Sequence, residues 1–182
     1  GQENNGLACM FTMMNNARLN VGMQGVGIAE RALQQSIIYA RERKQGKHFK
    51  NNNSESVEII NHPDVLKMLL KMKTLTEASR ALCYDNAIAI DLAESHPDKL
   101  MREKFKLKAD LLTPISKSWS TDIGVEVASL GIQIHGGMGF VEDTGAAQFF
   151  RDSRISPIYE GTNGIQAIDL VMRKLLLADG RA

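Results

Sequence analysis

The sequence predicts an all-α protein folded as an up-and-down four-helix bundle. Apolar residues recur every three or four positions along three long stretches, which is the period of an amphipathic helix. Sustained alternation with period two, the pattern of a half-buried strand, does not occur in the chain. Short polar or proline-containing segments separate the long stretches, so antiparallel packing closed by a last helix is the economical topology.

The first helix is expected from about Asn16 to Lys44. Its apolar face is formed by Leu19, Met23, Val26, Ala29, Leu33, Ile37 and Ala40. From Gln45 to Ser56 this face is lost and glycine and asparagine accumulate, which predicts an exposed polar loop. A second helix should begin near Pro63, since proline fits a first helical position, and end at about Ser95 before His96-Pro97.

The second half of the chain predicts three further helices. One runs from about Asp98 to Leu130, with a kink at Pro114, and ends before the glycine-rich run Gly136–Gly139. A short helix is expected from about Asp143 to Asp152 and a last one from about Asn163 to Ala178. Asn163 and Gln166 have the spacing of a capping box, a start signal for the last helix.

Composition excludes several classes of function. The net charge of +1 gives no long-range field to attract nucleic acid or an anionic membrane. No stretch reaches the roughly 18 apolar residues of a membrane-spanning helix. The two cysteines lie far apart, which favours a reduced compartment, and we expect a cytoplasmic protein. Four scattered histidines without paired spacing predict no metal site.

Two loops differ from the amphipathic background: Gln133–Phe140, which is rich in glycine, and Tyr159–Asn163 around Glu160. Glycines let a backbone approach a phosphate closely beside a helix end, but they equally suit a helix C-cap followed by a turn. The Glu160 carboxylate precedes a helix, where it could be a cap or a general base. The residues alone leave both pairs of alternatives open.

A resemblance to a known family decides between these alternatives. The order and spacing of Gln133-x-x-Gly136-Gly137-x-Gly139, Arg151-Asp152 and Ile158-Tyr159-Glu160-Gly161-Thr162 resemble the C-terminal signature of acyl-CoA dehydrogenases. Asn16-Ala17-Arg18 and Tyr39-Ala40-x-x-Arg43 are similar to that family's substrate-side and flavin-side positions. Residues 1–14 look like the exit from the family's β-domain, which leaves residues 15–182 as the helical bundle domain.

Other features look most like one larger bacterial subgroup of the family. They are the long polar loop, the helix start His62-Pro63-Asp64 and the segment Gly145-Ala146-Ala147-Gln148. This subgroup includes 3-methylthiopropionyl-CoA dehydrogenases and carries a further C-terminal segment.

The resemblance implies FAD-dependent oxidation of an acyl-CoA thioester to a trans-2-enoyl-CoA. Glu160 would remove the α-proton while the flavin takes the β-hydrogen as hydride. Some relatives carry the base immediately before the arginine that matches Arg18, where this chain has Ala17, so Glu160 is the implied sole base. The substrate contacts implied in the same way are Asn15, Arg18, Tyr159 and Gly161. For Arg18 the alternative is an exposed arginine at a helix start.

The resemblance also implies which residues hold the cofactor. The pyrophosphate and adenosine half of a neighbouring subunit's FAD falls to Arg43, Gln133, Gly136 and Gly137, and the subunit's own FAD to Thr162, Asn163 and Gly164. This implies a homodimer or homotetramer, with an electron-transfer flavoprotein or a similar acceptor as redox partner. After Arg43 the family's phenylalanine is absent, because Lys44-Gln45-Gly46 follows.

Two other functions remain as alternatives. A DNA-damage-response flavoprotein with little dehydrogenase activity shares this fold, and a basic DNA-binding surface would favour it. The chain by itself could also be a helical oligomerisation module. Because the family's pockets lie between this domain and the preceding ones, we expect no turnover from this chain alone.

Overall fold

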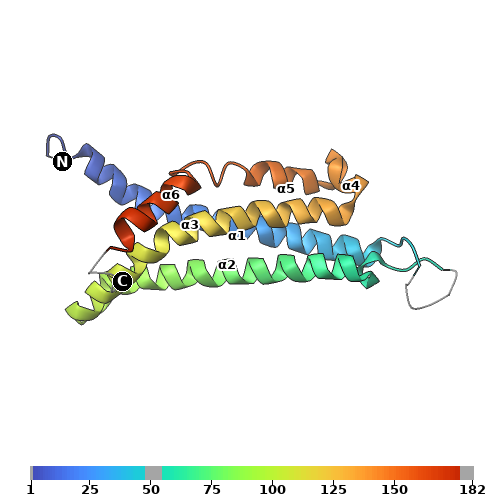
Figure 1. The fold of residues 1–182 in the computed structure, drawn as a ribbon, viewed down its shortest axis with the longest axis horizontal. Helices are drawn as coiled ribbons and strands as arrows, with labels where there is room; N and C mark the ends of the chain where they lie inside the picture. Colours follow the sequence, from blue (N-terminus) through green and yellow to red (C-terminus); the bar gives the residue numbers. More distant parts are fainter. Residues whose placement is uncertain (1, 48–54, 177–182) are drawn as a thin grey trace.

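A computed structural model describes residues 2–47 and 55–176, and it confirms the all-α class. Three long helices form the body of the molecule: α1 (Gly6–Glu42), α2 (Pro63–Ser95) and α3 (Lys99–His135). In Figure 1, α1 and α3 run in the same direction and α2 runs against them. The described residues contain no strand, only an isolated bridge between Lys44 and Glu58.

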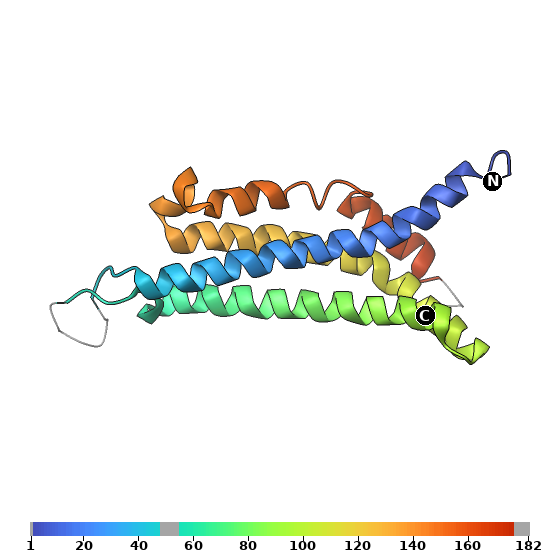
Figure 2. The same ribbon diagram turned by 180° about the vertical axis from the view of Figure 1, so that it is seen from behind.

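The fourth position of the bundle is filled by a chain of short elements rather than by one long helix. These are α4 (Gly137–Phe140), the 3-10 turn η2 (Glu142–Thr144), α5 (Ala146–Ser153), α6 (Asn163–Asp169) and the π-helical η3 (Leu170–Lys174). α5 packs on α1 and α3, and α6 packs on α3. Seen from behind, they return along α3 toward the beginning of α1 (Figure 2). The predicted last helix is therefore shorter and changes its hydrogen bonding at Leu170, while Leu177 and Ala178 lie outside the described residues.

The first helix begins earlier than the sequence predicts, at Gly6 instead of Asn16. Its added turns carry exposed apolar side chains, among them Leu7, Phe11 and Met13. These turns diverge from the other long helices (Figures 1 and 2). Because they bury no face in this chain, no apolar stripe marks them in the sequence.

The bounds of the other long helices follow local signals. Pro63 is the first residue of α2 and His62 before it is extended, as predicted. The Asp98 carboxylate caps α3 by accepting from the backbone N–H of Leu100 at 2.8 Å. α3 continues through the buried Pro114 and past the expected end at Leu130, and Gly136 with a φ of +60° ends it. The base of the polar loop is a short antiparallel pairing in which Gln45 N–H donates to Val57 C=O at 2.9 Å.

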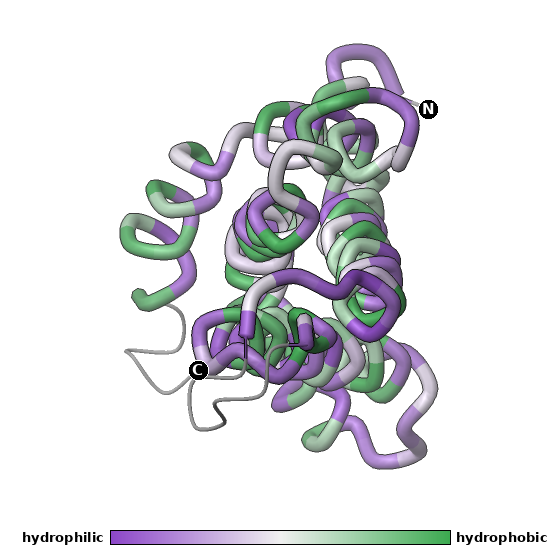
Figure 3. Tube along the Cα trace, turned by 90° about the vertical axis from the view of Figure 1, so that its right-hand side faces the viewer, coloured by the Kyte–Doolittle hydropathy of each residue, from purple (hydrophilic) through white to green (hydrophobic). Residues whose placement is uncertain are grey.

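The core lies where the three long helices meet, and it includes Leu33, Met72, Ile123 and Val127. In Figure 3, seen along the bundle, hydrophobic and hydrophilic residues alternate around each helix. α1 and α3 approach most closely through glycines: a Cβ added to Gly25 would lie 2.3 Å from the carbonyl oxygen of Ser120. This close crossing fixes how α1 sits on α3.

Candidate functional site

Glu160 lies in the loop between α5 and α6 and has an unusual backbone conformation. Its φ is +54°, and that of Gly161, which follows it, is +83°. Glycine adopts this left-handed region freely, whereas a residue with a Cβ loses about 1–2 kcal/mol there. Apart from Asn4 near the beginning of the chain, Glu160 is the only non-glycine residue with positive φ in the described segments. Such strain persists only where neighbouring structure imposes it.

The start of α6 supplies part of that structure. The Thr162 hydroxyl caps α6 by accepting from Ile165 N–H at 3.3 Å, and Asn163 N–H donates to Pro157 C=O at 3.0 Å. The buried Gln166 donates its amide N–H to Gly161 C=O at 3.1 Å. The predicted capping box is therefore wrong in its cap residue, which is Thr162. Asn163 is instead the first residue of the helix.

The side chain of Asn163 is turned toward α3 instead. Its Oδ1 accepts from Lys117 Nζ at 2.9 Å, and its Nδ2 donates to Asp122 Oδ1 at 2.8 Å and to Ser118 C=O at 3.1 Å. Lys117 is completely buried. This burial lowers the pKa of Lys117 to about 8, with the Asp122 charge opposing the shift and the Arg18 charge adding to it.

Sequence reasoning did not single out Lys117, because a lysine on an amphipathic helix is usually solvated. One signal was available. The core face of α3 around it consists of small polar residues, and a face of that kind leaves room for a long side chain: Thr113, Ser116, Ser120 and Thr121.

Arg18 forms a buried ion pair that joins α1 to α6. Its Nη1 lies 3.2 Å from Asp169 Oδ2 and also donates to Asn15 Oδ1 at 3.1 Å. The two side chains are only 5% and 3% exposed, and the other oxygen of Asp169 forms an ion pair with Arg173 Nε at 2.7 Å. The alternative of an exposed arginine at a helix start is excluded, because Arg18 lies inside α1 and is buried.

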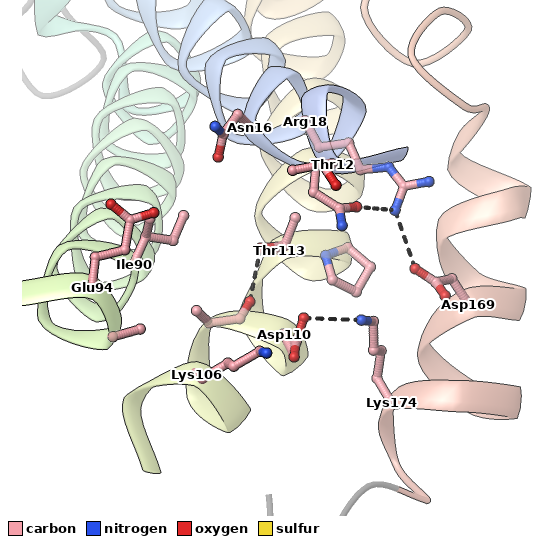
Figure 4. A pocket seen from close by; sticks show the side chains of 14 residues that line it. Thr12, Asn16, Arg18, Ile90, Glu94, Lys106, Asp110, Thr113, Asp169 and Lys174 are labelled. Carbon is pink, nitrogen blue, oxygen red and sulfur yellow. Dashed lines mark hydrogen bonds and ion pairs between the residues drawn. The ribbon is translucent and has the colours of Figure 1, made fainter. Parts of the chain in front are cut away.

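A cavity of about 550 Å³ brings together Asn15 and Arg18, two of the predicted substrate contacts (Figure 4). Its lining also includes Asp169 and two lysines, Lys106 and Lys174.

Glu160, Tyr159 and Gly161 do not line this cavity. Gly161 is nevertheless close to Arg18, since a Cβ built on it would lie 3.7 Å from Arg18 Nη2. Arg18 therefore lies between the cavity and the Glu160 loop. The Tyr159 hydroxyl donates to Gln24 Oε1 on α1.

A second cavity, of about 410 Å³ at the opposite end of the bundle, brings together Arg43, Gly136 and Gly137. His135 and Tyr39 also line it, with their rings stacked at 4.3 Å, and burial lowers the pKa of His135. Gln133 is exposed and is not part of the lining.

The two glycines of this cavity differ in whether their backbone conformation requires glycine. Gly136 has the positive φ of a helix cap, so a structural reason for glycine exists there. Gly137 has no such φ, and a Cβ added to it would meet nothing within 4 Å. The fold does not require glycine at 137, and the open space beside it can receive a ligand.

Two further classes of site find no support in the part of the chain that the structure describes. Its histidine, cysteine, aspartate and glutamate side chains form no cluster of three that could hold a metal ion. None of its helices combines the length and the apolar character needed to cross a membrane.

Comparison with known proteins identifies the family. Residues 4–176 match the acyl-CoA dehydrogenase C-terminal domain. The chain is 53% identical over 181 residues to 3-methylmercaptopropionyl-CoA dehydrogenase of Ruegeria pomeroyi, covering 100% of this chain and 31% of that protein. It is 35% identical to a butyryl-CoA dehydrogenase of Syntrophomonas wolfei, covering 96% of this chain and 29% of that protein.

The fold agrees with this assignment. ACDH-11 of Caenorhabditis elegans, solved in complex with C11-CoA, superposes with a TM-score of 0.83 at 26% identity, covering 97% of this chain and 28% of that one. The chain thus belongs to the acyl-CoA dehydrogenase family, to the part that forms its C-terminal helical domain. It spans about a third of the length of the relatives it matches.

Proposed function

We propose that the chain is the C-terminal domain of an FAD-dependent acyl-CoA dehydrogenase that converts an acyl-CoA to a trans-2-enoyl-CoA, with Glu160 as the base. The observation that carries this proposal is the left-handed backbone at Glu160, which Gln166, Thr162 and Asn163 hold in place. A carboxylate kept in a strained conformation is typical of a functional position. Some relatives carry the base at the position of Ala17, but alanine cannot act as a base, so Glu160 has no competitor there.

Glu160 would serve through both its side chain and its backbone. Its carboxylate would take the α-proton of the thioester. Its backbone N–H has no hydrogen-bond acceptor among residues 2–47 and 55–176, so it is available to polarise the thioester carbonyl. Polarisation of that carbonyl makes the α-proton acidic enough for a carboxylate to remove.

The substrate would lie along α1 and the Glu160 loop. Asn15 and Arg18 reach the larger cavity, and Tyr159 and Gly161 flank the base. The basic side chains of the lining are balanced by Glu94, Asp110 and Asp169, and Lys174 is paired with Asp110 at 3.1 Å. Lys106 would therefore be the lysine that meets a phosphate of coenzyme A. Since Arg18 is already paired with Asp169, its part is to hold Asn15 and the loop in place.

FAD fits the residues of the second cavity. Arg43 would pair with its pyrophosphate, and Gly137 leaves room for the approach of a phosphate, with Gly136 and Gln133 beside them. FAD bound in this cavity would belong to a neighbouring subunit, in which it would act as the hydride acceptor. Thr162 and Gly164 are exposed next to the base, where they would meet the subunit's own FAD. Asn163 would support this contact indirectly, because its side chain is bound to α3.

The proposal includes a homodimer or homotetramer in the cytoplasm that passes electrons to an electron-transfer flavoprotein or a similar acceptor. The rest of each pocket would come from parts of the longer protein outside these 182 residues, so the chain alone should show no turnover. The alternative, a DNA-damage-response flavoprotein, has no observation of this structure in its favour.

The test is anaerobic bleaching of the flavin in the full-length protein. The panel of substrates includes butyryl-CoA and 3-methylmercaptopropionyl-CoA, and wild type is compared with Glu160→Gln. Bleaching should disappear in the variant while FAD stays bound, whereas Glu126→Gln, on the exposed side of α3, should bleach as wild type does. Bleaching that persists in Glu160→Gln would rule out Glu160 as base. If wild type bleaches with no acyl-CoA, the DNA-damage-response relative becomes the better assignment.

A further inference from the structure

Lys117 is a buried lysine without a carboxylate in salt-bridge distance. Its side chain is fully enclosed, and its Nζ donates to a neutral acceptor, Asn163 Oδ1, at 2.9 Å. Within the described residues, no Asp or Glu oxygen lies within 4.0 Å of Lys117 Nζ. Burying an ammonium in this way costs stability unless another gain offsets it. The roles proposed for Glu160 and for the cofactor-binding residues do not involve Lys117.

The contacts of Asn163 show what the ammonium does. Its Oδ1 faces the Lys117 ammonium, which is a donor only. Its Nδ2 faces two groups of α3 that only accept, Ser118 C=O and Asp122 Oδ1, and the Thr121 hydroxyl lies within hydrogen-bond distance of both amide atoms. A flipped amide would point N–H groups at the ammonium and its oxygen at a carbonyl and a carboxylate. Lys117 on one side and the acceptors of α3 on the other therefore select the same orientation of the Asn163 side chain, and Lys117 holds its oxygen.

This fixed amide lies three residues after Glu160. The residues between are themselves held, Gly161 by Gln166 and Thr162 by its cap to Ile165. The position of Asn163 on α3 is thus transmitted to the left-handed backbone of Glu160 through two residues, each of which accepts a hydrogen bond from α6. The loop has few independent degrees of freedom once Asn163 is in place.

We propose that Lys117 is a positioning residue for the base: through Asn163 it holds the Glu160 loop against α3 in the conformation that proton removal requires. The inference rests on the proposed function of Glu160. Three charged groups face Lys117: Asp122 from its own helix, Arg18 from α1 and Glu160 from the loop. The ammonium and the Glu160 carboxylate attract each other, which adds to the effect of the tether.

A purely structural role predicts a different outcome for substitution. Replacing a buried charge by an apolar side chain of similar volume is often neutral or stabilising. In Lys117→Met the fold should therefore keep its stability while Asn163 Oδ1 loses the ammonium that holds the loop against α3. A structural role would lower stability and leave the chemistry per folded molecule unchanged.

The experiment measures removal of the α-proton without hydride transfer. Full-length protein with bound FAD is incubated in D₂O with an acyl-CoA that carries sulfur at the β position, so that no β-hydrogen is present, and α-deuterium uptake is followed by mass spectrometry. Lys117→Met should slow the exchange at least tenfold, with FAD content and melting temperature at or above the wild-type values. Lys104→Met, an exposed lysine of the same helix, should leave the exchange unchanged.

Asn163→Ala provides a second route to the same contact from the loop side, which keeps the inference testable if Lys117→Met does not fold. It should slow the exchange by a similar factor, and the double variant should be no slower than the slower single one, because both substitutions remove one interaction. In turnover with an oxidisable acyl-CoA, kcat should fall while KM stays within about twofold.

The outcomes separate the two proposals. Exchange at the wild-type rate in folded, FAD-loaded Lys117→Met overturns the role of Lys117, as does exchange at that rate in Asn163→Ala when Lys117→Met cannot be purified. Absence of exchange in wild type instead overturns the proposed function of Glu160.

Discussion

Arg18 on α1 and Asp169 on α6 form a buried ion pair at 3.2 Å although 151 positions separate them in sequence. The pair connects the first and the last α-helix of the described residues, and Figure 4 shows it at the side of the cavity that Asn15 and Arg18 line. Asp169 also forms an ion pair with Arg173, so one buried carboxylate balances two guanidinium groups. The Glu160 loop comes just before α6, which makes this pair one of its supports.

Removal of Asp169 should therefore be strongly destabilising. Asp169→Ala leaves the Arg18 guanidinium buried without a counter-charge, for which a loss of about 3–5 kcal/mol in the free energy of unfolding is expected. Urea unfolding followed by far-UV circular dichroism measures it. Glu126→Ala breaks the exposed pair with Lys71 and should change the free energy by less than about 1 kcal/mol. Equal effects of the two substitutions would contradict the burial of the Arg18–Asp169 pair.

Lys117 should make stability depend on pH in the alkaline range. Its pKa is about 8 in the folded chain, because burial disfavours the charge, and 10.5 without that burial. Between these values the unfolded chain binds more protons than the folded one, so the free energy of unfolding rises with pH. The free energy of unfolding of wild type minus that of Lys117→Met should therefore rise from pH 8 to about 10.5 and be constant below pH 8. A difference that is flat throughout would show that folding does not lower the pKa of Lys117.

Two glycines of α1 should respond in opposite ways to alanine. In Gly25→Ala the new Cβ would lie 2.3 Å from Ser120 C=O, so the helices must separate, and a loss of at least about 2 kcal/mol is expected. Gly27 is exposed and a Cβ there meets nothing within 4 Å. Gly27→Ala should raise the free energy of unfolding by about 0.5–1 kcal/mol through helix propensity. Melting temperatures of the two variants, on either side of wild type, would confirm the close crossing of α1 and α3.

Gly161 and Gly164 form a similar pair beside the candidate base. Gly161 has a φ of +83°, and a Cβ on it would come within 2.8 Å of Gln166 Nε2, the donor to its own carbonyl. Gly161→Ala should cost about 1–3 kcal/mol. In Gly164→Ala the new Cβ makes an ordinary contact with Thr162 Oγ1 at 3.8 Å, and the free energy of unfolding should change little or increase. Urea unfolding of both variants checks this, and a tolerated Gly161→Ala would contradict the left-handed loop.

The parts of the fold that local signals determine were predictable from the sequence. Pro63 and His96-Pro97 mark both ends of α2, and Asp98 and Gly136 bound α3. The start of α1 was not predictable, because the apolar residues from Leu7 to Met13 face away from the bundle and do not follow its period. The break of the last helix at Leu170 also carries no proline or glycine signal.

For the candidate site, sequence motifs located the loops but not the contacts that hold them. The spacing around Glu160 and Gly136–Gly137 was sufficient to place both loops at helix ends, and the structure brings Arg43 to the glycines. The burial of Lys117 and Asp169 depends on how α6 docks on α3 and α1, a long-range event that helical periodicity does not encode. The conformation of Glu160 follows from the same docking.

The crossing of α1 and α3 at Gly25 fixes the position of one long helix relative to the other. The Glu160 loop is connected to α3 through Asn163 and to α1 through Tyr159, and the end of α6 is connected to α1 through the Arg18–Asp169 pair. If the two long helices slid past each other, these connections would pull the loop in different directions. Side chains at the crossing would permit such sliding, whereas backbone seated on backbone does not. The glycines of the crossing thus limit how far the Glu160 carboxylate can be displaced, although they have no side chain.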